Sequence, residues 1–188
     1  DADRFGMIGN PYASAIDLRN VATSGGCAGT SFYVWDPKLL GSYNVGGIQT
    51  LTPSGGNYIV VPGGGSYGSS GSIVNTIESG AAFLVQATGS AGTVTITESS
   101  KTSGSNMVFR PVENSTENKL YINLYAKAGS QKNIADGNII FFADNYNNTV
   151  DAFDSRKQSN LGENLSIVKN TAKLAAERRN FPVKDDSI

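Results

Sequence analysis

One stretch of the sequence, residues 119–127, most narrows what this chain can fold into. Apolar residues occupy every second position from Leu120 onward, and polar or aromatic residues fill the positions between them. Successive side chains of a β-strand point to opposite faces, so a period of two predicts a strand rather than an amphipathic helix. The same period recurs at residues 93–97, where Val94 and Ile96 alternate with threonines. The pattern predicts a protein built from β-strands.

Composition supports the same fold class. The 188 residues include 22 glycines and 6 prolines, and only 16% are charged, which suits short strands joined by turns. We therefore expect an all-β fold, an antiparallel β-sandwich or jelly-roll-like arrangement, with one or two short helices near residues 16–22 and 151–158. The expected strands cover residues 5–8, 32–35, 58–61, 81–85, 93–97, 119–127, 138–142, 165–168 and 174–178.

The order of these segments indicates how the chain is organised. We expect a β-sandwich module over residues 1–128 and a β-rich continuation over residues 129–188, which either extends the module or forms a small second domain. The chain opens directly on a strand and stops at residues 186–188, where another strand would begin. We therefore expect incomplete last strands and a piece of a longer precursor.

Composition also excludes several classes of function. The chain contains no histidine, which excludes histidine-based triads, imidazole acid–base catalysis and zinc sites with imidazole ligands. A net charge of −1 gives no field that would favour nucleic acid or an anionic membrane surface. No apolar run is long enough to span a membrane, and the single cysteine, Cys27, cannot form an internal disulfide. We predict no enzymatic activity, no nucleic-acid partner and no membrane insertion.

The acidic and amide-rich segment at residues 144–154 is the strongest chemical signal. Calcium is bound by oxygen atoms at alternate positions of a loop, with a carboxylate entering late in that loop. The predicted ligands, and thus the predicted calcium cofactor site, are Asp144, Asn145, Asn147, Asp151 and Asp154. The first loop position falls on Ala143, which has no side-chain ligand, so either Asp144 substitutes in a shortened loop or the acidic residues cap a helix that starts at Asp151.

Two aromatic residues indicate a carbohydrate-binding face. Tyr121 and Tyr125 lie on the same side of the predicted strand, where flat rings can stack on sugars. Cross-strand packing under a second sheet is the alternative for these two rings. A carbohydrate-binding module would expose Tyr121, Tyr125 or Trp35 in a groove.

Several segments together resemble the large secreted and cell-surface proteins that Bacteroidota export by the type IX secretion route. They are Ile8-Gly9-Asn10-Pro11-Tyr12-Ala13-Ser14, Phe32-Tyr33-Val34-Trp35-Asp36-Pro37, residues 78–86, residues 95–101 and residues 174–179. This resemblance covers most of the chain and implies a β-rich extracellular module. The ending Asp186-Ser187-Ile188 resembles the D-[ST]-apolar O-glycosylation signal of exported proteins in this phylum, which predicts a glycan on Ser187.

These observations favour a non-catalytic extracellular module that serves a bacterial surface protein in adhesion or as a structural unit. Its expected partners are neighbouring domains, copies of the same protein and surface glycans. One alternative is a filament subunit in which a strand from a neighbour completes the sheet. A carbohydrate-binding module is a second alternative. A glycosidase, which would need two carboxylates facing each other across a cleft, is a third.

Overall fold

The computed structural model confirms the all-β class. It describes residues 4–37, 39, 45–62, 75–103 and 117–182. Within these residues the chain forms β-strands and two short 3-10 turns, η1 (Leu18–Asn20) and η2 (Glu98–Ser100). No helix in the described part of the chain is long and apolar enough to cross a membrane.

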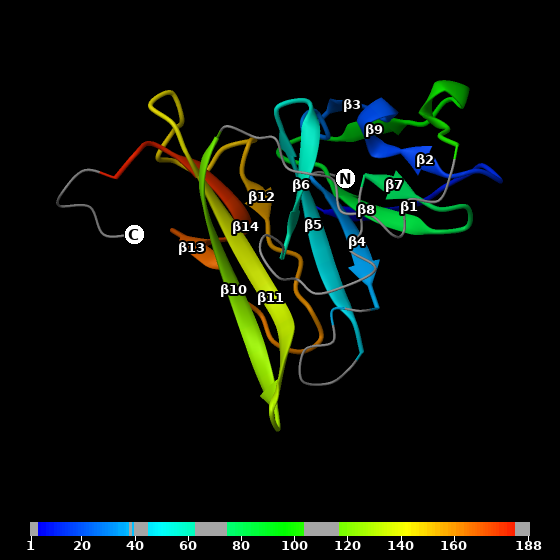
Figure 1. Cartoon of the computed structure of the whole chain (residues 1–188). Coiled ribbons are helices and arrows are strands. Elements are labelled where there is room, and N and C mark those ends of the chain that lie inside the picture. Colours follow the sequence, from blue (N-terminus) through cyan, green and yellow to red (C-terminus); the bar gives the residue numbers. More distant parts are fainter. Residues whose placement is uncertain (1–3, 38, 40–44, 63–74, 104–116, 183–188) are drawn as a thin grey trace.

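The N-terminal half forms one large antiparallel sheet and two small ones (Figure 1). The strand order of this first sheet is β1 (Phe5–Gly9), β8 (Ala82–Gln86), β4 (Phe32–Asp36), β5 (Gly47–Ser54) and β6 (Asn57–Val61). The small sheets pair β2 (Ile16–Asp17) with β7 (Thr76–Ile77), and β3 (Ala22–Gly25) with β9 (Gly92–Thr95). The strands predicted at residues 5–8, 32–35, 58–61 and 81–85 are confirmed.

The main hydrophobic core lies between the first sheet and the two small sheets. Phe32 and Leu51 of the first sheet are fully buried in one cluster with Ile16, Leu18 and Ile77. The period of two places Phe32 and Leu51 on one face of the first sheet. The burial of this cluster is the main favourable term in folding this half of the chain.

The C-terminal half forms a second large sheet. Its order is β10 (Asn118–Ala128), β11 (Gln131–Phe142), β14 (Ala172–Arg179) and β12 (Ser155–Arg156), and β13 (Ile167–Lys169) also pairs with β14. The strands predicted at residues 119–127, 138–142 and 174–178 are confirmed, and the strand predicted at residues 165–168 begins only at Ile167. One expectation is corrected: β14 runs parallel to β11, because the long connection over residues 143–171 carries the chain back before β14 begins.

The two large sheets pack against each other through the second face of the first sheet. Ile59 and Val61 of β6 form a second core cluster with Ile139, Phe141 and Ala176. Strand β4 is covered on both faces, because its neighbouring residues Phe32 and Tyr33 point to opposite faces and are both fully buried.

Hydrogen bonds add a polar part to the contact between the large sheets. The Ser155 hydroxyl donates to Oγ1 of Thr52 over 2.8 Å and shares a hydrogen bond with the Ser31 hydroxyl. The Tyr33 hydroxyl donates to the carbonyl of Arg156. Although β12 has only two residues, it therefore fixes the second sheet to both β4 and β5.

The helix predicted at residues 151–158 is wrong. Asp151 and Asp154 accept hydrogen bonds from backbone N–H groups inside turns, and the next two residues pair with β14 as strand β12. The helix predicted at residues 16–22 shortens to η1, a single turn between β2 and β3. Asp17 caps that turn by accepting the N–H of Arg19.

The boundary predicted after residue 128 falls inside a hairpin. β10 and β11 pair along their whole length, from Asn118 opposite Phe142 to Ala128 opposite Gln131. A division at this point would split the second sheet, so the strand that was assigned to the first module belongs with the C-terminal half. Residues 183–188, where incomplete last strands were predicted, lie outside the described residues.

A buried ion pair fastens the long connection to β11. Asp136 is fully buried and forms an ion pair with Lys157, which is also buried. The other oxygen of Asp136 accepts the N–H of Leu165 over 2.7 Å. Burial lowers the pKa of the Lys157 ammonium, and the negative charge of Asp136 opposes that effect.

This pair gives a prediction about stability. Asp136→Ala leaves the Lys157 ammonium buried without its partner and should lower the free energy of unfolding by about 3–5 kcal/mol, as measured by urea denaturation. Lys157→Met should cost less, because the carboxylate keeps its backbone N–H partners. The double variant should lose less than the sum of the two single losses, and strict additivity would contradict a direct interaction.

Candidate functional site

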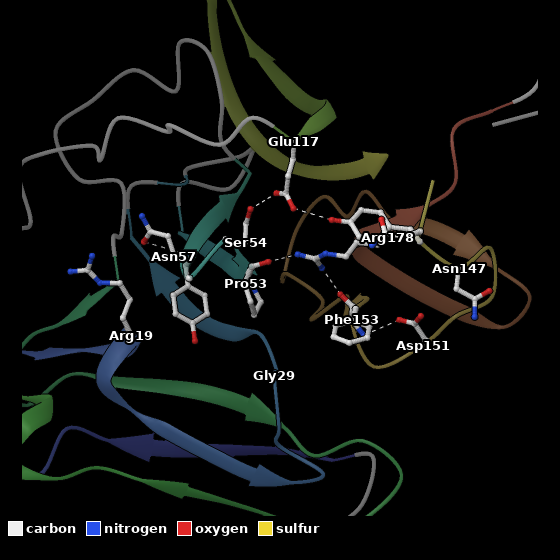
Figure 2. Close-up of a pocket in the computed structure, with 15 residues that line it drawn as sticks. Arg19, Gly29, Pro53, Ser54, Asn57, Glu117, Asn147, Asp151, Phe153 and Arg178 are labelled. Atoms are coloured by element: carbon white, nitrogen blue, oxygen red, sulfur yellow. Dashed lines mark hydrogen bonds between the residues drawn. The ribbon is translucent and has the colours of Figure 1, made fainter. Parts of the chain in front are cut away.

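A cleft of about 520 Å³ opens at one end of the two large sheets (Figure 2). Its first wall is the turn between β5 and β6 with the residues on either side, including Pro53 and Tyr58. Its second wall is the loop after β11, including Tyr146 and Phe153. Each wall belongs to a different large sheet or its connections, so the cleft exists only because the two sheets pack together.

Arg178 of β14 joins the two walls. Its guanidinium donates one hydrogen bond to the carbonyl of Pro53 on the first wall and another to the carbonyl of Phe153 on the second. The guanidinium carbon also lies 4.6 Å from the centre of the Phe141 ring. The planar shape of the group suits two fixed carbonyl partners, so Arg178 sets the separation of the walls.

Glu117 forms a second polar bridge at the edge of the cleft. One carboxylate oxygen accepts a hydrogen bond from the Ser54 hydroxyl, and the other accepts the Tyr146 hydroxyl over 2.9 Å. Burial and the hydrogen bond to Glu117 raise the pKa of Tyr146. The Tyr146 hydroxyl is therefore protonated at neutral pH and holds the loop after β11 against the start of β10.

The open part of the cleft combines aromatic rings with amide and charged groups. Phe153 has 68% of its surface exposed, and burial raises the pKa of Tyr58 to about 12 so that its hydroxyl stays neutral. Oδ1 of Asn57 accepts the N–H of Tyr58 and the side-chain amide of Asn75. Rings and neutral hydrogen-bonding groups side by side can bind a ligand that is both hydroxylated and partly apolar.

The structure brings three of the five predicted calcium ligands to this cleft. Asn145, Asn147 and Asp151 line it, whereas Asp144 is exposed outside it. Asp154 points inward instead, where its two oxygens accept the N–H groups of Arg178 and Asp151. Burial raises the pKa of this carboxyl against the effect of those hydrogen bonds.

Two of the predicted ligands that line the cleft each use one side-chain oxygen for a hydrogen bond within the loop. Oδ1 of Asn147 accepts the N–H of Thr149, and Oδ1 of Asp151 accepts the N–H of Phe153. Among the described residues, no group of three or more acidic, cysteine or histidine side chains is arranged to hold a metal. Calcium binding at this loop stays a prediction.

The predicted carbohydrate residues lie away from the cleft. Tyr121 is half-buried, where it packs on the second core cluster with the Lys119 ammonium 5.7 Å from its ring centre. Tyr125 is 45% exposed and Trp35 is 41% exposed, and neither lines the cleft. The two tyrosines therefore do not present a matched pair of open rings. Ser187, the predicted glycan carrier, lies outside the described residues.

Sequence reasoning missed the two residues that join the walls of the cleft. Arg178 and Glu117 lie far apart along the chain, and neither belongs to a pattern that predicts a binding site. One further signal was Phe153, a large apolar residue inside a segment otherwise rich in Asp and Asn. Such a residue in a polar loop is either exposed for binding or folded inward, and only the structure distinguishes these cases.

Fold and site together define an all-β domain of two large packed sheets with a cleft at their junction. The chain belongs to the family described as Domain of unknown function (DUF8693), whose model matches residues 1–188. No curated protein and no solved structure shows a significant match to the chain.

The bridge made by Arg178 can be tested by a conservative substitution. Arg178→Lys keeps the charge but cannot reach both carbonyls in one plane, and should lower the free energy of unfolding by about 1–3 kcal/mol. Arg179→Lys, at the next position of β14, is the matched control and should have little effect on the urea midpoint. Equal losses in the two variants would contradict the bridging role.

Calcium binding is tested by thermal unfolding. An ion that binds only the folded state must raise the melting temperature, so the temperature should rise with added CaCl2 and fall again with EGTA. Asp151→Asn removes a charge at the cleft and should reduce this shift, while Glu98→Gln, on η2, should leave it intact. A melting temperature that changes with neither CaCl2 nor EGTA would contradict the predicted site.

Proposed function

We propose that this domain is a non-catalytic adhesion module of a bacterial cell-surface protein and that its cleft binds a carbohydrate. The cleft between the large sheets is the observation that carries the proposal. It places an exposed aromatic ring, Phe153, beside the amide of Asn147 and the carboxylate of Asp151. Sugars offer apolar ring faces and many hydroxyls, so rings and planar polar groups together suit them.

The rigidity of the walls supports a binding role. Arg178 and Glu117 fix the two walls by hydrogen bonds within the protein, so the cleft is formed before a ligand arrives. A preformed site loses less conformational entropy on binding than a site that must first order its loops. Phe153 can then provide contact area without further folding.

The state of the carboxylates favours binding over hydrolysis. Glycoside hydrolysis needs one carboxylic acid and one carboxylate that are both directed at the sugar. Both oxygens of Glu117 accept hydrogen bonds from Ser54 and Tyr146, and one oxygen of Asp151 serves the backbone of its own loop. We therefore propose that the cleft binds a glycan and releases it without hydrolysing it.

The resemblance to type IX secretion cargo supports an extracellular location. It rests on segments such as Ile8-Gly9-Asn10-Pro11-Tyr12, where the structure gives Asn10 a defined role. The Asn10 amide donates to the carbonyls of Ser14, Ile77 and Glu78, so the segment ties the end of β1 to β7 of one small sheet. A surface protein gains from such a cross-linked turn because it resists local opening.

Glycan-array binding followed by calorimetry tests the proposal. The domain should bind at least one polysaccharide or oligosaccharide class, and Phe153→Ala should weaken that binding about tenfold with no change in melting temperature, because this ring is exposed. The recovered glycan should have an unchanged mass.

Tyr125→Ala is the matched control, because it removes another exposed ring, 45% exposed, at the site predicted from the sequence. If Tyr125→Ala abolishes binding and Phe153→Ala does not, the glycan site lies on β10 rather than in the cleft. Absence of binding to every glycan class would contradict the proposed function, and a shortened glycan would contradict its non-catalytic character.

A further inference from the structure

The buried ion pair on β11 brings an amine into direct contact with a carboxyl group. Nζ of Lys157 donates to Oδ1 of Asp136, and the two side chains are 3% and 0% exposed. Residues 134–141 of β11 are all buried, so the contact lies in the interior of the protein. An amine and a carboxyl group that touch each other away from water are the two reactants of an amide bond.

Two backbone N–H groups hold the carboxyl group in position. The N–H of Gly137 donates to Oδ1 of Asp136 over 2.8 Å, and the N–H of Leu165 donates to Oδ2 over 2.7 Å. When an amine adds to a carboxyl carbon, negative charge develops on one carboxyl oxygen, and a fixed N–H group directed at that oxygen stabilises the charge. The N–H of Leu165 has this position toward Oδ2.

We propose that Lys157 and Asp136 condense to an intramolecular amide bond between Nζ and Cγ, with the release of one water molecule. The inference is independent of glycan binding, because neither residue lines the cleft.

The reaction needs no reagent other than the two side chains. The Lys157 ammonium first transfers a proton to Oδ1 of Asp136, and the neutral Nζ then adds to Cγ while Oδ2 takes up the negative charge beside the N–H of Leu165. A second proton passes from Nζ to Oδ1. The bond between Cγ and Oδ1 then breaks, Oδ1 leaves as water, and Oδ2 becomes the oxygen of the amide carbonyl.

Burial and proximity both favour this condensation. Burial lowers the pKa of the Lys157 ammonium, which makes the neutral, nucleophilic amine easier to form. Groups that are held in a reactive orientation have effective molarities of about 10⁵–10⁸ M, which opposes the hydrolysis that dominates in dilute solution. The amide also replaces two buried charges by a neutral group and so removes their desolvation cost.

The bond would join strands on either side of β14. Asp136 belongs to β11 and Lys157 directly follows β12, and β14 lies between these two strands in the sheet. The bond closes a covalent ring over residues 136–157, which include Tyr146 and Phe153 of the second wall of the cleft. Such a ring limits how far this segment can separate from the sheet even when the hydrogen bonds open.

Intact-mass spectrometry of the full chain tests the proposal. The folded wild-type chain should be lighter than its sequence predicts by the mass of one water molecule, and unfolding in urea should not restore that mass. Lys157→Met should have its full sequence mass. Lys169→Met is the matched control, because it removes the lysine of another ion pair, with Glu177, whose lysine side chain is 19% exposed, and this variant should keep the deficit.

A tryptic map of the wild-type chain locates the bond and requires no variant to fold. Trypsin cleaves after Arg156 but not after an acylated Lys157, so peptides 133–156 and 157–169 should be recovered as one branched species. A wild-type chain of full sequence mass, with the two segments recovered separately, would overturn the proposal.

One other reaction removes the same mass and is distinguished by the same experiment. A succinimide at Asp136-Gly137 also releases one water molecule, but it leaves Lys157 open to trypsin. It would also persist in Lys157→Met. A mass deficit with either of these properties would contradict the bond between the two side chains.

Discussion

The guanidinium of Arg178 is the interaction on which the arrangement of the two large sheets most depends. It donates to a carbonyl on each side of their junction and lies over the Phe141 ring of the second core cluster. Apolar contacts alone would hold the sheets together without fixing how far apart their ends lie. Two directional hydrogen bonds from one rigid group remove that freedom, and the cleft follows as a consequence.

Smaller polar groups also fix the two large sheets relative to each other by directional contacts. The hydroxyls of Ser155, Thr52 and Ser31 form a short buried network, and the ion pair of Asp136 and Lys157 fastens the long connection against β11. Buried polar groups are costly when they lack a hydrogen-bond partner, and a shift of one sheet against the other would remove these partners. Gly137 permits the close approach, since a Cβ atom there would lie 2.8 Å from Pro62. These contacts define one arrangement among several that hydrophobic burial would tolerate.

The proposed carbohydrate site uses a surface that this junction leaves open. The cleft lies where the ends of the sheets diverge, and its exposed Phe153 is supported by a loop that Asp154 and Arg178 hold in place. Tyr121 of strand β10 packs on the second core cluster and so places one face of this strand against the first sheet. A single packed scaffold thus supports the proposed ligand site at one end of the two sheets.

The sequence by itself determined the strands and the fold class, because a period of two and the turn residues act over neighbouring positions. It placed β10, the last residues of β11 and β14 correctly, and part of β13. It also predicted a helix at residues 151–158, which is wrong, since the partners of Asp154 and Ser155 lie on β14 and β5. It found three residues of the cleft wall, Asn145, Asn147 and Asp151, through their loop chemistry. The parallel pairing of β11 with β14 and the bridge of Arg178 to Pro53 join positions 37 and 125 residues apart, respectively. Only the tertiary structure decided those contacts, because no local pattern encodes which distant backbone a side chain will meet.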